Sequence, residues 1–231
     1  SILLHAFDCA EESGCQPSGV ALGPDGYLYG VTRYGGDFNN GAVFRLTADG
    51  ELTVLRALDP DAPWWPVSPL IPGNDGHFYG TALSSGESLS GTIYRLTPAG
   101  ELTVLRTFAE GECRYAPASL IQNRDGTLYG VCPLGGGTTR YGLLFSLSRD
   151  GELETLYEFG GAEGAFPATV VQAGDNEFLV AAQGFGPDGG GSIVRVRTEG
   201  GGSGGGASGG LALAILVTAA LWSYRRPALC G

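Results

Sequence analysis

The feature that most constrains this chain is an internal repeat of about 50 residues. Turn signals led by Asp recur in phase at Asp25-Gly26, Asp75-Gly76, Asp125-Gly126 and Asp175-Asn176. The apolar segments after these turns read YLYGVT, HFYGTA, TLYGVC and EFLVAA. A glycine-rich loop and a second apolar segment follow in each unit: GAVFRLT, GTIYRLT, GLLFSLS and GSIVRVR. A period of this kind predicts an array of similar units, each packed on its neighbours.

Each unit is predicted to consist of short β-strands. The segments are rich in Val, Leu, Tyr, Phe and Thr, and Asp-Gly, Gly-Gly or Pro separates them, which is the signature of strands and hairpins. Several segments alternate polar and apolar residues, as Arg45 does with Phe44 and Leu46. No stretch before residue 205 has helical periodicity. Four antiparallel strands in about 50 residues is the size of a β-propeller blade.

The two ends of the array predict how it closes. The units cover residues 18–58, 68–108, 118–159 and 168–198, and the last one lacks its fourth strand. The segment Ile2–Phe7 aligns with the fourth strand Thr103–Phe108 of the second unit. We therefore predict an all-β domain over residues 1–199, a propeller of four four-stranded blades in which residues 2–7 complete the last blade and remove an exposed sheet edge. The alternative is a piece of a larger propeller.

Composition supports a folded, exported domain and argues against nucleic acid as a partner. The chain has 231 residues with 41 Gly, yet 43% of it is hydrophobic, which is too apolar for a disordered chain. The formal net charge is −11, so the chain repels phosphate backbones. Cys9, Cys15, Cys113 and Cys132 are predicted to form two disulfides in an oxidising compartment, with their pairing left open and free buried thiols as the alternative.

The sequence offers little for catalysis. It contains no GxSxG, HExxH, P-loop or CxxC motif, and we predict no catalytic residue, metal or cofactor. His5 aligns with Arg56 and Arg106, and His77 lies at a turn, which favours structural roles for both. We favour a non-enzymatic binding or structural role. The alternative is a polysaccharide hydrolase or lyase in which carboxylates of different units converge at the propeller mouth, for example Glu110, Glu112, Asp59 and Asp61.

Aromatic residues are the best candidates for binding. Similar loops between units carry an aromatic residue just before a proline, and the set is Trp64, Trp65, Tyr115 and Phe166. Tyr34 and Phe38 lie in another class of loop, beside Gly35-Gly36. Exposed aromatic rings on loops stack on sugar rings or anchor protein partners. The alternative is that they fill gaps between adjacent blades.

The C-terminal tail predicts membrane targeting. Residues 200–210 are a Gly/Ser-rich linker, and an apolar segment at 211–224 precedes Arg225 and Arg226. An apolar run ended by arginines predicts a membrane-inserted helix with its Arg end in the cytoplasm and the repeat domain outside. Its 14 residues are fewer than the ~20 that span a bilayer comfortably.

Two resemblances extend these predictions. The motif DGxLYGxTxxGGxxxxGxVFRLTxDGELTVLxxF, clearest over 25–58 and 125–159, resembles the GloVer tandem repeat of bacterial secreted and surface proteins. The fourth unit departs from it, with Leu179-Val180 in place of Tyr-Gly. That resemblance implies no catalytic residues.

The tail resembles the GlyGly-CTERM sorting signal, carried here by Gly204, Gly205, Gly206, Ser208, Gly209, Gly210, Arg225 and Arg226. This resemblance implies transient anchoring in the membrane, cleavage by a rhomboid-type sorting protease, and an extracytoplasmic protein at the cell surface or released from it. The alternative is a permanent anchor. Cys230 lies beyond the Arg pair, outside the predicted disulfides.

Overall fold

The computed structural model describes residues 2–59, 64–83, 90–137 and 139–198. The predicted linker at 200–210, the predicted helix at 211–224 and the residues of the sorting motif lie outside this part of the chain. Among the described residues, no helix is long and apolar enough to cross a membrane.

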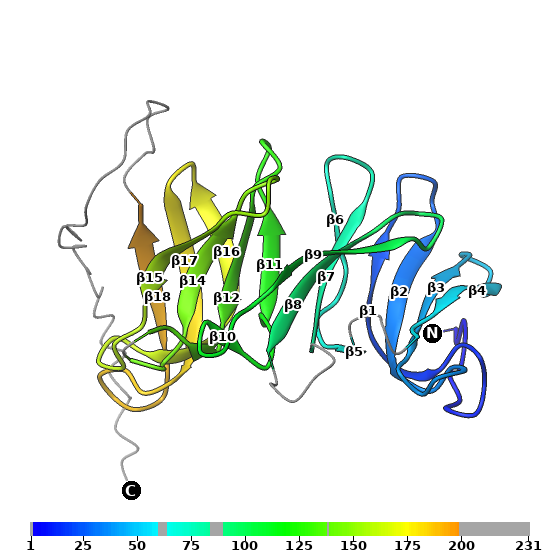
Figure 1. Cartoon of the computed structure of the whole chain (residues 1–231), viewed down its shortest axis with the longest axis horizontal. Coiled ribbons are helices and arrows are strands. Elements are labelled where there is room, and N and C mark those ends of the chain that lie inside the picture. Colours follow the sequence, from blue (N-terminus) through cyan, green and yellow to red (C-terminus); the bar gives the residue numbers. More distant parts are fainter. Residues whose placement is uncertain (1, 60–63, 84–89, 138, 199–231) are drawn as a thin grey trace, which may run out of the picture.

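Four antiparallel sheets follow one another along the chain (Figure 1). The first sheet has the order β1–β2–β3–β4, formed by β1 (Cys15–Leu22), β2 (Leu28–Tyr34), β3 (Ala42–Leu46) and β4 (Leu52–Ala57). The second sheet has the order β5–β7–β8–β9, with β6 also paired to β7; its strands are β5 (Trp64–Pro66), β6 (Ile71–Pro72), β7 (Phe78–Leu83), β8 (Gly91–Leu96) and β9 (Leu102–Thr107). Each sheet is one repeat unit.

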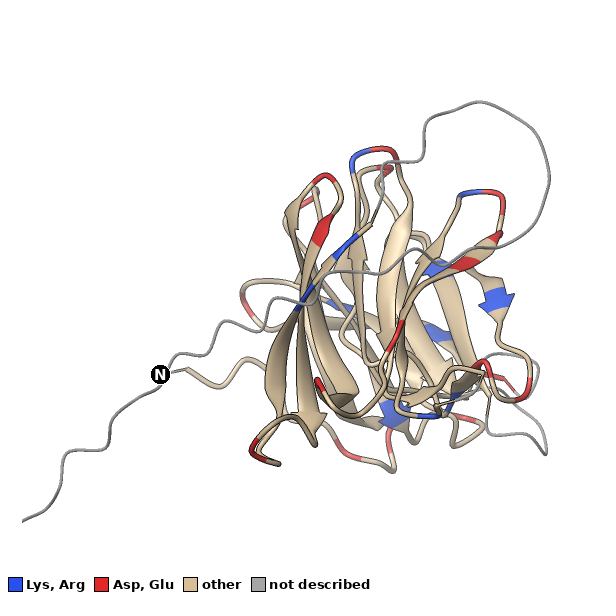
Figure 2. Cartoon of the chain, turned by 90° about the vertical axis from the view of Figure 1, so that its left-hand side faces the viewer, with Lys and Arg blue, Asp and Glu red and all other residues tan. Residues whose placement is uncertain are grey.

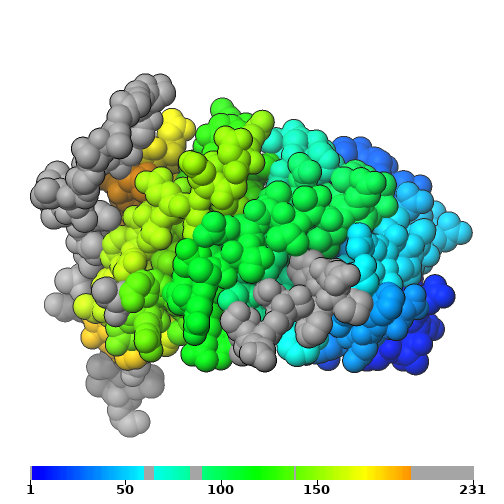
Figure 3. Space-filling view, viewed as in Figure 1, coloured from blue at the N-terminus to red at the C-terminus, as the bar shows by residue number. Residues whose placement is uncertain are grey.

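The third sheet has the order β11–β12–β14–β15, formed by β11 (Ser119–Gln122), β12 (Leu128–Cys132), β14 (Leu143–Leu147) and β15 (Leu153–Glu158). A small pair accompanies it, β10 (Cys113–Arg114) with β13 (Leu134–Gly135). The fourth sheet has three strands in the order β16–β17–β18, namely β16 (Ala165–Gly174), β17 (Glu177–Gly184) and β18 (Ser192–Arg197). Space-filling colours run in sequence order from one end of the molecule to the other (Figure 3).

The Asp-led turns connect the first two repeat strands of each sheet. In the first turn, Gly26 has a φ of 85°, a left-handed conformation that glycine adopts without steric cost. The Asp25 carboxylate accepts hydrogen bonds from the Tyr27 backbone N–H (3.2 Å) and the Tyr29 hydroxyl (2.7 Å). In the second turn, the Asp75 carboxylate accepts the same two bonds, from the His77 backbone N–H (3.2 Å) and the Tyr79 hydroxyl (2.7 Å). The spacing Asp-x-x-x-Tyr therefore ties these two turns to their following strands. In the third turn Asp125 accepts the equivalent backbone bond from Thr127 (2.9 Å), and the fourth has Leu179 in place of the tyrosine.

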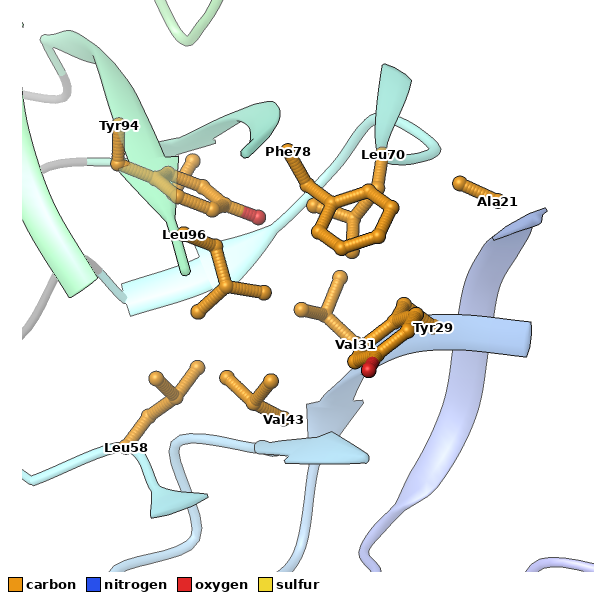
Figure 4. Close-up of a cluster of buried hydrophobic side chains, with 10 residues drawn as sticks. Ala21, Tyr29, Val31, Val43, Leu58, Leu70, Phe78, Tyr94 and Leu96 are labelled. Carbon is orange, nitrogen blue, oxygen red and sulfur yellow. The ribbon is translucent and has the colours of Figure 1, made fainter. Parts of the chain in front are cut away.

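The core lies between successive sheets rather than within one. Tyr29, Val31 and Val43 of the first sheet pack against the second sheet, and Figure 4 shows these side chains pointing toward Leu70, Phe78, Tyr94 and Leu96. The rings of Tyr29 and Phe78 are 4.5 Å apart, and those of the equivalent pair Tyr129 and Phe178 are 4.7 Å apart. Similar clusters join the second sheet to the third and the third to the fourth. Alternate residues of each strand therefore serve two different interfaces.

The all-β fold and the repeat are confirmed, but the predicted closure by residues 2–7 is wrong for this structure. Those residues form no strand, and β18 pairs with β17 alone among the described strands. The N-terminal segment lies against the first sheet instead, where the ring of Phe7 is 5.0 Å from that of Phe44. Figure 1 shows the N-terminus at the first-sheet end of the array and β18 at the opposite end. Burial of Phe7 against Phe44 favours this position over pairing with β18.

Candidate functional site at the loop end

The array has two different ends (Figure 1). We call the end with the Asp-led turns, at the top of the figure, the turn end. The opposite end, at the bottom, carries the glycine-rich loops and the linkers between sheets, and we call it the loop end. Figure 2 shows most acidic residues in the turns and loops at both ends, whereas many of the arginines lie on the strands. Loops displayed by a rigid scaffold are the usual places for binding residues.

A left-handed residue recurs at the loop end where each sheet begins. The four positions are Gln16 (φ 56°), Trp65 (φ 48°), Tyr115 (φ 77°) and Phe166 (φ 56°). Non-glycine residues rarely adopt such angles. The pairing register shifts at Trp65, and in the first and fourth sheets it shifts just after the proline that follows the left-handed residue, which marks β-bulges close to these positions. Because Gln16 adopts the same conformation, the bend belongs to the fold, whereas the side chain displayed on it differs from repeat to repeat.

The aromatic side chains on these bends are accessible to different degrees. Trp65 is 37% exposed with its ring 6.0 Å from that of Tyr34, and Tyr115 is 42% exposed with the Arg114 guanidinium 5.3 Å from its ring centre. Phe166 is half-buried. Trp64 belongs to β5, and its side chain lies outside the described part. Trp65 and Tyr115 therefore match the predicted ligand-facing role better than Phe166 does.

Phe185 is an exposed aromatic that the sequence analysis missed. It is 50% exposed, and its ring lies 5.4 Å from that of Tyr141 and 5.9 Å from that of Phe166. Its φ of 54° occupies the loop position where the first repeat has Gly35 at φ 76°. Both loops close with the same kind of backbone bond, Gly41 N–H to Gly35 O (3.0 Å) and Gly191 N–H to Phe185 O (2.9 Å). An aromatic residue in place of a repeat glycine was the signal in the sequence.

Two disulfides brace this end of the molecule. Cys9 pairs with Cys15, and Cys113 pairs with Cys132, with Cα–Cα distances of 4.7 Å and 5.5 Å. Cys15 directly precedes the left-handed Gln16, and Cys113 lies two residues before Tyr115. The second disulfide also joins the small β10–β13 pair to the third sheet through β12. Cross-links so close to a strained bend restrict the motion of the side chain displayed there.

Two of the carboxylates considered for glycoside cleavage, Glu112 and Asp59, are hydrogen-bonded within their own repeats. Glu112 accepts hydrogen bonds from Arg106 (3.0 Å) and from the Ala109 backbone N–H (2.8 Å), and Asp59 accepts one from Arg56 (2.9 Å). Partial burial raises the pKa of Glu112, but the Ala109 and Arg106 bonds outweigh it and hold that pKa below its usual value. Glu110 is exposed, and Asp61 lies outside the described residues. Glu112 and Asp59 thus fasten each linker to the fourth strand of its own repeat.

In the third repeat, a side chain of the fourth strand also bonds to a carboxylate in the following linker, but the donor is a tyrosine instead of an arginine. Tyr157, at the position of Arg56 and Arg106, donates a hydrogen bond to Glu163 (3.0 Å). Burial and the neighbouring Glu163 carboxylate raise the pKa of Tyr157, so this hydroxyl keeps its proton. His5, at the equivalent place near the N-terminus, has its ring 4.7 Å from that of Phe7. These residues support the loop end rather than forming a reactive centre.

A polar cavity of about 390 Å³ lies at the turn end between the second and third sheets. Asp75, Tyr79 and Arg95 line one side of it, and Arg149 and Asp150 line the other. Partial burial alone would raise the pKa of Asp75, but hydrogen bonds from Tyr79 and His77 lower it, so this carboxyl is ionised at neutral pH. The sequence alone does not indicate this cavity, because the two sides of the cavity come from different repeats. Among the described residues, no group of three His, Cys, Asp or Glu side chains could hold a metal ion.

Comparisons with known proteins agree with the repeat architecture. The family model described as Gloeobacter/Verrucomicrobia repeat matches residues 1–194. No curated protein sequence matches the chain significantly.

Similar solved structures include a gluconolactonase from Xanthomonas campestris, with 18% identity and a TM-score of 0.51 over 80% of this chain and 63% of that one. The extracellular domain of a candidate one-component system from B. thetaiotaomicron has 12% identity and a TM-score of 0.53, over 81% of this chain and 22% of that one. The chain spans less than two thirds of either protein. At these identities the likeness concerns the propeller-like fold alone.

Proposed function

The chain belongs to the Gloeobacter/Verrucomicrobia repeat family, and we propose that it is a non-enzymatic binding protein whose loop end contacts glycans. The observation that carries this proposal is the display of Trp65 and Tyr115 on left-handed bends that recur in every sheet. Aromatic rings bury a large area and stack on the apolar faces of sugar rings. The exposed Phe185 extends the same surface around the fourth sheet.

The structural setting supports binding with a low entropic cost. The bends fix the backbone, the Cys113–Cys132 disulfide lies two residues from Tyr115, and Trp65 has the ring of Tyr34 beside it. Aromatic side chains have few rotatable bonds, so a site built from them loses little freedom when a ligand binds. Arg114 beside the Tyr115 ring adds hydrogen-bond donors for ligand hydroxyls.

Glycan binding by the full chain, measured on an array and then by titration, tests the proposal. Replacing both Trp65 and Tyr115 by Ala is expected to weaken binding by about 10-fold or more, since each aromatic contact contributes about 0.5–1.5 kcal/mol beyond its buried area. Leu22→Ala is the control, because Leu22 is 63% exposed but ends β1 at the turn end, outside the proposed surface. Absence of binding to any glycan, or equal loss in the control, would contradict the proposal.

The second candidate function is that of a hydrolase acting on polysaccharides or sugar derivatives. It is favoured by the cavity between the second and third sheets, in which the carboxylates of Asp75 and Asp150 line a single space. The lowered pKa of Asp75 suits a base or nucleophile rather than a proton donor. Hydrolysis of lactones and polysaccharides that is lost on Asp150→Asn, with folding intact, would support this candidate.

We propose that the protein is exported, displayed outside the cytoplasm and released after its tail is processed. The tail sequence at 204–226 supports this, as do the two disulfides, which form in oxidising compartments. The proposed partners of the tail are the membrane and a rhomboid-type sorting protease. Mass spectrometry of the secreted form is expected to find a chain that lacks the segment from Leu211 onward. An intact terminal Gly231 would contradict this proposal.

A further inference from the structure

Among the described residues, the last sheet has an unpaired edge. In the first three sheets a fourth strand covers the edge, and the residue after it donates a backbone hydrogen bond to the glycine before the third strand. These bonds run from Leu58 to Gly41 (2.9 Å), from Phe108 to Gly91 (2.9 Å) and from Phe159 to Gly142 (3.0 Å). The equivalent carbonyl of the last sheet belongs to Gly191, and among the described residues no fourth strand reaches it. An open edge of this kind is a template for another strand.

The outward face of the last sheet also has no described sheet packed against it. Ile193 on β18 is 70% exposed, whereas Val43, Ile93 and Leu144 at the equivalent positions are 0% exposed because the next sheet covers them. Val171 on β16 is 50% exposed on the same face. This surface therefore has the side chains of an inter-sheet core without a sheet to cover it.

At the first-sheet end of the molecule, residues 2–7 occupy the position that the fourth strand of a preceding repeat would have. The contact between Phe7 and Phe44, at 5.0 Å, matches that between Phe108 and Phe145, at 5.4 Å, where Phe108 follows a true fourth strand. A Cβ on Gly50 would lie 2.5 Å from the Leu4 carbonyl oxygen, just as one on Gly151 would lie 3.7 Å from that of Leu105. Residues 2–7 thus lie on the first sheet where a preceding repeat would place its fourth strand.

The surface of this N-terminal segment is apolar and open. Ile2 is 88% exposed and Leu3 is 80% exposed, and Val20 on β1, on the same face of the first sheet as Phe44, is 50% exposed. Within one molecule the segment and β18 lie at opposite ends of the array (Figure 1). The segment could reach its own β18 only by giving up the contact between Phe7 and Phe44.

We propose that β18 of one molecule pairs with residues 2–7 of a second copy of this chain, so that the two copies complete one four-stranded sheet head to tail. The repeat fixes the register. Arg195 lies opposite Ile2, and Ser192 lies opposite Ala6, as Arg95 and Thr92 lie opposite Thr103 and Thr107 within the second sheet. The Phe7 backbone N–H then donates to the Gly191 carbonyl oxygen.

This pairing needs no rearrangement of either copy. The segment stays on the first sheet of its own molecule, and the last sheet of the other copy takes the place of the preceding repeat. Ile193 then becomes buried against the first sheet of the second copy, as Val43, Ile93 and Leu144 already are at the three interfaces inside the chain, and Val171 becomes partly covered, as Ile71 and Ile121 are. The contact is heterologous, so repeated use gives a ring if the rotation closes and a filament if it does not.

A mixed-tag cross-linking experiment on the full chain tests the proposal. One tagged chain carries Ile2→Cys, a chain with a different tag carries Arg195→Cys, and both carry Cys230→Ser. Residues paired across two strands are close enough for a disulfide. Mild oxidation is expected to give a covalent species of twice the chain mass that contains both tags and returns to single chains on reduction. Association through the apolar tail does not bring these two positions together.

The matched control replaces Arg195→Cys with Arg95→Cys, at the same position in a sheet whose edge β9 already covers. This pair is expected to give no mixed species. Equal cross-linking in the control would overturn the proposal, and so would absence of the mixed species with Arg195→Cys. A cross-link formed only within a single chain that carries both Ile2→Cys and Arg195→Cys would likewise overturn it, because it would indicate closure within one molecule.

Discussion

The turn end and the loop end are built on the same four sheets, yet they differ in how strictly the repeat is kept. At the turn end, the first two repeats make the same two hydrogen bonds from Asp25 and Asp75 at the same distances. At the loop end, one backbone bend carries Gln16, Trp65, Tyr115 and Phe166 in turn. The Asp carboxylate also accepts a backbone bond in the third repeat, from Thr127, while Leu179 replaces the tyrosine in the fourth. Chemistry shared by successive repeats at this end indicates a requirement of folding. Variable side chains on a constant backbone at the other indicate a surface free to acquire binding specificity.

The largest expected effect at the loop end comes from breaking the Cys113–Cys132 disulfide. Its sequence separation of 19 residues corresponds to about 3 kcal/mol of stability from loop closure in the unfolded chain. The double variant Cys113→Ser, Cys132→Ser should therefore unfold at a markedly lower denaturant concentration than the wild type. Chemical denaturation measures this, and a midpoint that does not move would mean that the cross-link adds no stability.

At the turn end, Gly76→Ala is expected to cost about 1–2 kcal/mol, the typical cost of a left-handed conformation for a residue with a Cβ. Gly76 has a φ of 79°, and an added Cβ would meet no atom within 4 Å, so the whole effect comes from the backbone. Glycan binding at the loop end should be unchanged in this variant. Loss of glycan binding without loss of stability would contradict the prediction that the turn end takes no part in binding.

A smaller effect is expected for the hydroxyl of Tyr29. Tyr29→Phe removes its hydrogen bond to Asp25 and should destabilise the protein by about 1 kcal/mol. The control is Tyr94→Phe, because the Tyr94 hydroxyl is buried without a hydrogen-bond partner in the described part of the chain. Its removal should leave the free energy of unfolding unchanged or slightly increase it. Equal destabilisation by both variants in urea titrations would contradict the structural role of the Asp–Tyr pair.

The smallest expected effect is a dependence on acidic pH. The hydrogen bond from Tyr29 lowers the pKa of Asp25 in the folded protein, and bonds from Tyr79 and His77 lower that of Asp75 against the opposing effect of burial. A carboxyl with a lowered folded-state pKa stabilises the protein above its unfolded-state pKa, and this stability is lost as pH falls through the folded-state value. Stability should therefore decline below about pH 4, and less steeply in Tyr29→Phe.

Sequence reasoning reached the repeat because strands and turns are local. A turn is predicted from the adjacent pair Asp25-Gly26, and a strand is predicted from the alternation of polar and apolar residues over 43–47. Both predictions need only a few neighbouring residues. The sequence could not decide where residues 2–7 lie. Their apolar residues suit pairing with the edge of the last sheet and also suit packing on the face of the first sheet. Pairing at β18 and burial of Phe7 against Phe44 are alternatives that only the three-dimensional arrangement separates.

The candidate site was predictable in part. Trp65 and Tyr115 stood out as aromatic residues near prolines, and the structure adds the left-handed bends that display them. Phe185 was missed because it becomes noticeable only when the loops of the first and fourth repeats are aligned, where it stands in place of a glycine. The cavity beside Asp75 was missed because Arg149 and Asp150, on its other side, come from the following repeat.

The most direct test of the account compares the two ends in one binding measurement. For a glycan that the full chain binds, the dissociation constant would be measured for wild type, for Trp65→Ala with Tyr115→Ala, and for Tyr29→Phe at a temperature where all three are folded. The account predicts that binding weakens by about 10-fold or more in the loop-end variant and stays at the wild-type value in the turn-end variant. Equal affinity for all three proteins, or a loss confined to Tyr29→Phe, would contradict it.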